Sequence, residues 1–343
     1  MEFLIAGYYG YRNWGDEGAL ATLLQVLPRE AVGVLSGDPV FTESAYGVCA
    51  VPRMHWRAVR SAIQRSHALI FGGGSLLQDA TSLRSLVYYL TLIQWGLRAH
   101  GRVLLVGQGV GPLRRPLSRW LVARILRRVP LISLRDEESA NLLRQLGVAN
   151  SRVDADLTWA LQPQSPHIAL EANARWVGLA PRTWGSAPVH AMFAALCQYL
   201  QQRGYRPLLI PMQETQDRAL CEAIAATSNA AVAAPPQHPA QLMGLMHTLT
   251  GMVAMRLHGA IFAAAQGVPV LAISYDPKVD ALAKQLGMPC LALADAPASL
   301  TEACEAFLQQ RNALQQRLLD ATPLLRQKTE QLLAQVITAA GLP

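Results

Sequence analysis

Short apolar runs alternate with helix-like segments along most of this chain, and this rhythm strongly limits the folds open to it. Each run is followed by a polar or glycine turn and then by a stretch with helical spacing. A strand, a turn and a helix repeated in this order build a parallel sheet with both faces covered. The runs of the first series are Phe3–Ala6, Ala31–Leu35, Ala68–Phe71, Arg102–Val106 and Leu131–Leu134. The pattern predicts a doubly wound α/β fold.

This alternation of strand-like and helix-like segments is interrupted once, by the polar segment Gln162–Pro166 with its two prolines, and then resumes. The runs of the second series are Trp176–Ala180, Pro207–Ile210, Gly251–Met255 and Val270–Ile273. We therefore predict two Rossmann-like domains, residues 1–161 and 167–299, with helices over residues 300–343 that pack on them. Ligands bind at the carboxyl ends of such sheets, so a cleft between two of them, as in GT-B-type transferases, is the expected site.

The composition excludes several classes of protein. Charged residues make up 15% of the chain and apolar residues 51%, which excludes disorder. The most apolar helical stretch, Leu86–Leu97, is too short to span a bilayer and is predicted to be a core helix. The N-terminus lacks a basic region and a cleavage site, so a cytoplasmic protein is expected. The five cysteines form no CxxC pair, and neither a zinc site nor a disulfide framework is indicated.

The net charge of +7 comes from 27 arginines and 3 lysines set against the acids. It suggests anionic ligands or a negatively charged surface, or it reflects genomic composition. The segment Leu113–Arg128 is rich in arginine, has no acid, and carries Leu117, Trp120, Leu121 and Ile125 at helical spacings. It is either a solvated outer helix or a helix that rests on the anionic inner face of the cell membrane.

The first glycine turn, Gly7–Gly18, follows a strand and opens a helix, so its backbone N–H groups are suited to an anion. Its glycines are not spaced as GxGxxG, which weakens a dinucleotide interpretation. Asp16 either caps the helix, which is the favoured alternative, or holds a sugar hydroxyl.

Two further glycine turns follow strands. One, Gly72–Asp79, contains Gly73 and Gly74 in a run of three glycines, and the other, Gly107–Pro112, contains Gln108. Consecutive glycines cost chain entropy, so a ligand or another backbone is expected to approach closely.

Cationic side chains follow several predicted strands. Arg135 is either a fork for a carboxylate or phosphate or part of a helix cap with a surface charge pair to Asp136. Lys278, after Tyr275, is either a phosphate contact or a solvated residue at a helix start. Arg182 is a weaker candidate of the same kind.

The strongest local signal is Met255–Pro269, where an apolar strand ends in Arg-Leu-His before an alanine-rich helix. Arg256 and His258 share one side of the chain if the strand's end stays extended. An arginine beside an imidazole suits anion binding and proton transfer. A purely structural histidine is the alternative.

Together these segments resemble the polysaccharide pyruvyl transferase family, and specifically its CsaB branch, which pyruvylates secondary cell-wall polymers. The resemblance covers nearly the whole chain and departs from the family at Trp14, where a small or polar residue is common. The segments that carry it are Gly7–Gly10, Gly72–Asp79, Gly107–Leu113, Ser133–Asp136, Met255–His258 and Ser274–Lys278.

The resemblance implies a GT-B-like fold, phosphoenolpyruvate as donor, and a lipid-linked amino-sugar oligosaccharide as acceptor. The typical product is a 4,6-ketal on N-acetylmannosamine. No metal, other cofactor or nucleic acid is expected. The residues that match the family's donor positions are Arg135, Arg256, His258 and Lys278. Further substrate-binding candidates are Asp16, Arg182, Gly73, Gly74, Gln108 and Tyr275.

Two other functions compete. A nucleotide-sugar glycosyltransferase of the same architecture usually holds the ribose with a C-terminal glutamate, but no glutamate lies between Glu222 and Glu302. A non-catalytic sugar-binding or scaffold protein would give no reason for Arg-Leu-His and three glycine turns.

Overall fold

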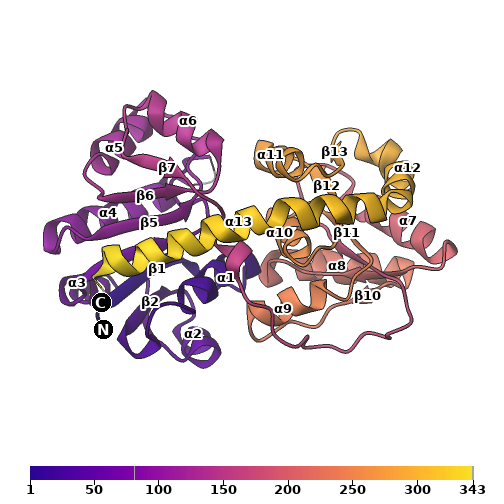
Figure 1. Ribbon diagram of the computed structural model, residues 1–343, viewed down its shortest axis with the longest axis horizontal. Helices are drawn as coiled ribbons and strands as arrows, with labels where there is room; N and C mark the ends of the chain where they lie inside the picture. The colour runs from indigo at the N-terminus through magenta and orange to yellow at the C-terminus, as the bar shows by residue number, and fades with distance from the viewer. Residues whose placement is uncertain (81, 342–343) are drawn as a thin grey trace. The chain divides into compact units, whose positions relative to one another are not determined.

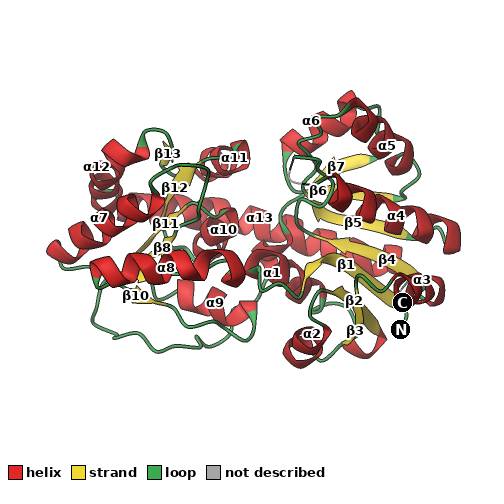
Figure 2. Cartoon of the chain, turned by 180° about the vertical axis from the view of Figure 1, so that it is seen from behind, coloured by secondary structure: helices red, strands yellow, loops and turns green. Residues whose placement is uncertain are grey.

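The structure is a computed structural model that describes residues 1–80 and 82–341. The chain divides into two compact units (Figure 1). Unit 1 is Met1–Leu161 together with the chain from Leu325 onward, and unit 2 is Gln162–Leu324. Each unit has its own parallel sheet with helices on both faces (Figure 2), so the predicted pair of doubly wound domains is confirmed.

The sheet of unit 1 has the strand order β3-β2-β1-β4-β5-β6-β7 in the described residues, and every pairing is parallel. Its strands are β1 (Phe3–Tyr9), β2 (Val32–Ser36), β3 (Cys49–Pro52), β4 (Ala68–Gly72), β5 (Val103–Gln108), β6 (Leu131–Leu134) and β7 (Ser151–Val153). The order reverses between β1 and β4. In doubly wound sheets ligands bind beyond the carboxyl ends of the strands at such a reversal.

The helices of unit 1 join these strands in sequence. They are α1 (Trp14–Leu23), α2 (Pro39–Tyr46), α3 (Trp56–Arg65), α4 (Leu83–Ala99), α5 (Pro116–Leu126) and α6 (Glu137–Gln145), with the 3₁₀ helices η1 (Arg29–Ala31) and η2 (Leu157–Ala160). Helix α4 buries Leu86, Leu90 and Ile93, which share one face, so the predicted core helix is confirmed. Helix α4 packs against both α3 and α5.

The sheet of unit 2 has the order β10-β9-β8-β11-β12-β13, again with parallel pairings, and reverses between β8 and β11. Its strands are β8 (Trp176–Ala180), β9 (Arg206–Leu209), β10 (Ala231–Val232), β11 (Gly251–Ala254), β12 (Val270–Ser274) and β13 (Cys290–Ala292). Its helices are α7 (Val189–Gln202), α8 (Glu214–Ser228), α9 (Pro239–Met246), α10 (Leu257–Ala265), α11 (Pro277–Leu286) and α12 (Ala296–Gln309). Helix α10 lies within the core because it is apolar on nearly every side.

The last helix, α13 (Arg311–Ala340), begins in unit 2 and ends in unit 1. In unit 1 it buries Leu332 and Val336, and the Thr329 hydroxyl donates a hydrogen bond to the Asp156 carbonyl over 3.1 Å. The C-terminal helix is thus part of the core of unit 1. None of the described helices is long and apolar enough to cross a membrane.

Candidate active site

The glycine turn after β4 lies where the sheet of unit 1 reverses. Gly73 and Gly74 have φ angles of +66° and +75°, which side chains rarely allow. A Cβ on Gly73 would lie 2.6 Å from the Ala19 Cβ, and one on Gly74 would lie 2.7 Å from the Asp16 Oδ1. The predicted close approach exists, but the approaching atoms are side chains of α1. These glycines let α1 pack against the turn.

Asp16 is not the cap of α1, so the favoured alternative for this residue was wrong. The helix already begins at Trp14, with Asn13 in the N-cap position, and Asp16 lies in the first turn. The early start follows from the burial of Trp14, which packs edge-on against Phe41. Asp16 is 8% exposed beside Gly74. Its carboxylate is stabilised by the helix N-terminus and lies at the sheet reversal.

Glu17, which the sequence did not single out, anchors the first glycine turn from within the core. Its carboxylate accepts the Gly10 N–H over 2.9 Å and the Tyr46 hydroxyl over 2.9 Å. The side chain is fully buried. Burial raises the pKa of Glu17 to about 7, against the lowering effect of the hydrogen bonds from Tyr46 and Gly10.

The raised pKa of Glu17 predicts a stability that falls with rising pH. Its folded pKa lies above its unfolded value, so the folded state holds the extra proton between roughly pH 4.5 and 7. The bound proton of Glu17 should contribute its whole stabilisation below about pH 4.5. The free energy of unfolding should then fall by about 3 kcal/mol as the pH rises from about 4.5 to about 7. Denaturant unfolding at several pH values measures this. Glu17→Gln should remove most of the slope, and an equal slope in both proteins would contradict the prediction.

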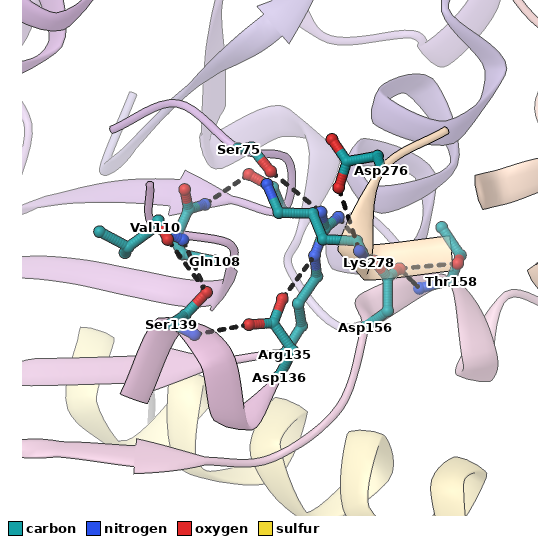
Figure 3. A network of polar contacts seen from close by, with 11 residues as sticks. Ser75, Gln108, Val110, Arg135, Asp136, Ser139, Asp156, Thr158, Asp276 and Lys278 are labelled. Atoms are coloured by element: carbon teal, nitrogen blue, oxygen red, sulfur yellow. Dashed lines mark hydrogen bonds and ion pairs between the residues drawn. The ribbon is translucent and has the colours of Figure 1, made fainter. Parts of the chain in front are cut away.

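Arg135 ties three loops of unit 1 together (Figure 3). Its guanidinium donates to the Ser75 hydroxyl over 2.9 Å, to Asp156 over 3.3 Å and to Asp136 over 3.4 Å. Asp136 also caps α6 by accepting the Ser139 N–H over 2.8 Å, so the predicted helix cap is confirmed. The predicted charge pair with Asp136 exists, at 3.4 Å, but it is not on the surface, because the Arg135 side chain is only 7% exposed.

The guanidinium of Arg135 still has capacity for a ligand. An arginine has five N–H donors, and three of them are used within the described residues. Its charge faces two carboxylates, Asp136 and Asp156. Arg135 is therefore a rigid donor whose positive charge is already compensated.

Gln108 holds the end of β4. Its Nε2 donates to the carbonyls of Phe71, over 3.2 Å, and Gly73, over 2.5 Å, which fixes the orientation of the amide. Its Oε1 is buried and has no hydrogen-bond partner among residues 1–80 and 82–341. The described hydrogen bonds of its side chain are with the glycine turn and the strand before it, so the structure gives the Gln108 side chain a positioning role.

In unit 2, the expected extended arrangement of Arg256 and His258 is wrong. Strand β11 ends at Ala254, Arg256 is the N-cap of α10, and His258 is already helical. The helix starts at once because Gly259 packs closely, where a Cβ would lie 3.2 Å from the Ala180 Cβ. The Arg256 side chain makes no capping hydrogen bond, and the N-terminus of a helix favours an anion. His258 is half-buried on this first turn.

Arg256 is bound to a carboxylate that the sequence analysis missed. Its Nε lies 2.9 Å from the Asp217 Oδ2 and its Nη2 lies 2.5 Å from the Asp217 Oδ1. Asp217 is 1% exposed. The Nη1 group has no hydrogen-bond partner in the described part of the chain and remains available. The position of Asp217, in the first turn of the helix after β9, could have marked it as a residue near this sheet edge. Nothing in the sequence, however, linked it to Arg256.

Arg182 is the arginine of this edge whose charge is not compensated. Its Nη1 donates to the Tyr275 hydroxyl over 2.6 Å, and its guanidinium lies 5.2 Å from the Trp184 ring centre and 5.1 Å from that of Tyr275. In the described residues no carboxylate lies within ion-pair distance of it. Arg182 is thus a better anion ligand than its sequence context indicated. Trp184, 41% exposed, was not predicted at all.

Lys278 lies at the start of α11, as one of its two alternatives expected. Asp276 caps this helix and accepts the Lys278 N–H over 3.0 Å. The lysine side chain is half-buried, which is less exposed than a fully solvated residue. A phosphate contact stays a prediction.

The carboxyl ends of β8, β11 and β12 are neighbours in the sheet of unit 2, and half of the predicted site residues follow these strands. The residues that follow these strands are Arg182, Arg256, His258, Tyr275 and Lys278. Such an edge suits a small ligand with two acidic groups and a reaction that moves a proton. No cluster of three metal-ligating His, Cys, Asp or Glu side chains occurs within residues 1–80 and 82–341.

Known structures share the fold of this chain at low sequence identity. A co-structure of S. aureus MnaA with UDP has a TM-score of 0.71 at 9% identity and covers 100% of this chain and 98% of its own. UDP-N-acetylglucosamine 2-epimerase from Neisseria meningitidis, bound to its nucleotide sugar, has a TM-score of 0.60 at 9% identity, with 98% and 100% covered. Anabaena Alr3699/HepE with UDP-glucose has a TM-score of 0.60 at 13% identity, with the same coverage. The predicted GT-B-like fold is confirmed.

No curated protein matches the chain by sequence. The family model of polysaccharide pyruvyl transferases matches residues 17–277, which is well over half of the chain. The matched range includes Arg135, Arg182, Arg256 and His258, and ends one residue short of Lys278. The chain belongs to the polysaccharide pyruvyl transferase family.

Proposed function

We propose that this protein transfers the pyruvyl group of phosphoenolpyruvate to two hydroxyls of a cell-wall polysaccharide precursor, releasing phosphate and forming a cyclic ketal. The observation that supports it best is that Arg182, which has no carboxylate partner in the described residues, lies at the same sheet edge as Arg256 and the N-terminus of α10. A donor with a carboxylate and a phosphate needs at least two such cationic positions.

The proposed donor contacts rest on the kind of cation that each side chain provides. Arg182 and the Nη1 of Arg256 offer planar N–H donors, and Lys278 adds a point charge. Arg135 in unit 1 is a further predicted contact for a carboxylate or phosphate, and two of its N–H groups are unused within the described residues. These cations, not a divalent ion, are proposed to neutralise the departing phosphate.

The proposed chemistry has three bond-making steps. A proton from His258 forms the new C–H bond at C3 of the enol, which leaves an oxocarbenium-like centre at C2. A sugar hydroxyl then attacks C2 and returns its proton to the imidazole. The C2–O bond to phosphate breaks, the second hydroxyl attacks C2, and phosphate accepts its proton. Protons and electrons balance without any oxidant or reductant.

The acceptor is proposed to be a lipid-linked amino-sugar oligosaccharide, pyruvylated at the 4 and 6 hydroxyls on the cytoplasmic side of the membrane. In unit 1, Asp16 at the sheet reversal supports a contact with a sugar hydroxyl, since its carboxylate accepts hydrogen bonds and is next to the glycine turn. This acceptor would place the protein in the assembly of secondary cell-wall polymers that anchor surface layers.

A nucleotide-sugar glycosyltransferase is the second candidate. It is favoured by the titles of the structural neighbours, several of which are complexes with UDP or UDP sugars. The absence of a glutamate between Glu222 and Glu302 counts against it, because such enzymes usually hold the ribose through that residue.

Phosphate release tests the proposal directly. The protein should release phosphate from phosphoenolpyruvate only when a pyrophosphoryl-linked amino-sugar disaccharide is present, and EDTA should leave the rate unchanged. UDP release from UDP-N-acetylglucosamine with the same acceptor is the parallel assay for the alternative. Release of UDP without release of phosphate would reject pyruvyl transfer. A rate that vanishes in EDTA and returns with magnesium would reject the metal-free step.

A further inference from the structure

The exposed large apolar side chains of unit 1 are concentrated on one surface. Apart from Met1 and Val40, those in the described part of this unit lie at the beginnings of the neighbouring helices α3, α4 and α5. Their exposed fractions are 66% for Met54, 40% for Trp56, 37% for Leu83, 47% for Val87, 64% for Leu117 and 55% for Trp120. We call this set the apolar patch.

The loops that lead into these helices are tied together, so the patch is one surface. The Asp79 carboxylate accepts the N–H groups of Arg114, over 2.7 Å, and Arg115, over 3.0 Å, just before α5 begins. The Gly111 N–H donates to the Leu77 carbonyl over 2.8 Å. Between α3 and α4, the ring centre of Trp56 on α3 lies 5.4 Å from that of Tyr88 on α4. The starts of α4 and α5 therefore adjoin, and α3 contacts α4.

The segments that carry the patch are positively charged and have no exposed acidic residue. Asp79 is the only acidic residue between Glu43 and Asp136, and it is buried, with its carboxylate bound to backbone N–H groups. The exposed arginines at the beginnings of these helices are Arg57, Arg60, Arg84, Arg114 and Arg115. These segments would therefore be attracted to an anionic surface.

Helix α5 differs in detail from the predicted membrane helix. Leu121 and Ile125 are half-buried against the core of unit 1, so they are not part of the exposed face. Leu117 and Trp120 remain exposed, and the Arg124 guanidinium lies 5.3 Å from the Trp120 ring centre. An exposed tryptophan and leucine among arginines are typical of proteins that rest in the interfacial layer of a bilayer.

We propose that the apolar patch is a docking face for an anionic lipid bilayer, in which Leu117, Trp120 and Trp56 enter the headgroup layer while the surrounding arginines contact lipid phosphates. Helices α3, α4 and α5 each follow a strand, so their beginnings lie at the carboxyl edge of the sheet, where Ser75 and Arg135 also lie. Docking would hold that edge at the membrane surface. The proposal does not depend on the reaction assigned to the protein.

Cosedimentation with vesicles tests the proposal without any substrate. The protein should bind vesicles of equal parts phosphatidylglycerol and phosphatidylcholine at low salt, bind pure phosphatidylcholine vesicles much less, and be released as salt rises. Arg114→Gln with Arg115→Gln should weaken partitioning roughly thirtyfold. Leu117→Ser with Trp120→Ser should weaken partitioning onto the vesicles by about tenfold or more.

Matched changes outside the patch provide the control. Val40→Ser with Arg29→Gln alters an exposed apolar side chain and an exposed arginine of the same unit that are not on α3, α4 or α5, and should leave binding unchanged. All these variants should melt like the parent because their side chains are exposed. Absence of binding at low salt, or an equal loss in the control, would overturn the proposal. So would a dimer, seen by light scattering, that the Leu117→Ser and Trp120→Ser changes abolish, because the patch would then bind a second copy.

Discussion

A His258→Gln variant is expected to bind phosphoenolpyruvate nearly as well as the parent protein and to turn over roughly 10²–10⁴ times more slowly. The proposed role of the side chain is to deliver a proton to C3, and that proton moves only in the transition state. Glutamine keeps a hydrogen-bonding side chain but cannot act as an acid at neutral pH. Imidazole is the side chain type that exchanges protons near neutrality, whereas guanidinium does not release one.

Calorimetric titration gives the affinity of the variant for the donor, and phosphate release gives its turnover. In heavy water the parent protein should place deuterium in the methyl group of the ketal, which mass spectrometry detects. Turnover close to that of the parent would mean that His258 is not the general acid. A large loss of donor affinity with unchanged turnover would instead make it a binding residue.

The second large effect concerns stability, because Arg256 and Asp217 form a buried ion pair. Arg256→Ala is expected to lower the free energy of unfolding by about 3–5 kcal/mol, since the Asp217 carboxylate would stay buried with only neutral donors such as the Gln213 N–H. Adding Asp217→Asn should recover most of this loss, because no unpaired charge remains. Denaturant unfolding of both variants measures the difference. A loss of less than about 1 kcal/mol in the single variant would mean that solvent reaches Asp217.

Donor affinity is best compared in variants that keep their fold. Arg182→Gln, whose parent side chain has no carboxylate partner in the described structure, should lower affinity for phosphoenolpyruvate roughly tenfold to a hundredfold. Its free energy of unfolding should change by less than about 1.5 kcal/mol. The Arg256→Ala, Asp217→Asn double variant should lose donor affinity in the same range. Normal affinity in both proteins would mean that phosphoenolpyruvate does not bind at this edge of unit 2.

The strands that the sequence revealed are those in the interior of each sheet. Every predicted run corresponds to a strand, and the strands it missed, β3, β7, β10 and β13, are the edge strands of the two sheets. Interior strands of a parallel sheet are covered on both faces and need continuous apolar runs, which are visible in a sequence. The edge strands are short and partly exposed, as in Ser151–Val153, so they carry no such signal.

The positions of the site residues were also visible in the sequence, because a residue that follows a buried strand must lie at the carboxyl edge of a parallel sheet. This rule placed Arg182, Arg256 and Lys278 correctly. It also placed Arg135 after β6. The sequence did not predict the local backbone geometry, for example at His258, which lies in a helix and not in an extended strand end. Gly259 lets α10 begin directly after the strand.

The sequence by itself determined the two doubly wound sheets, the family, and which loops meet the carboxyl edges. Only the tertiary structure decided which cations are compensated. Asp217 neutralises Arg256 from 39 positions away, and Asp156 contacts Arg135 from 21 positions away. The Arg182 guanidinium, by contrast, contacts two aromatic rings and a hydroxyl and has no carboxylate partner in the described residues. Apolar periodicity reports burial along one segment, but a charge pair depends on distance in space between segments, which a single sequence does not record.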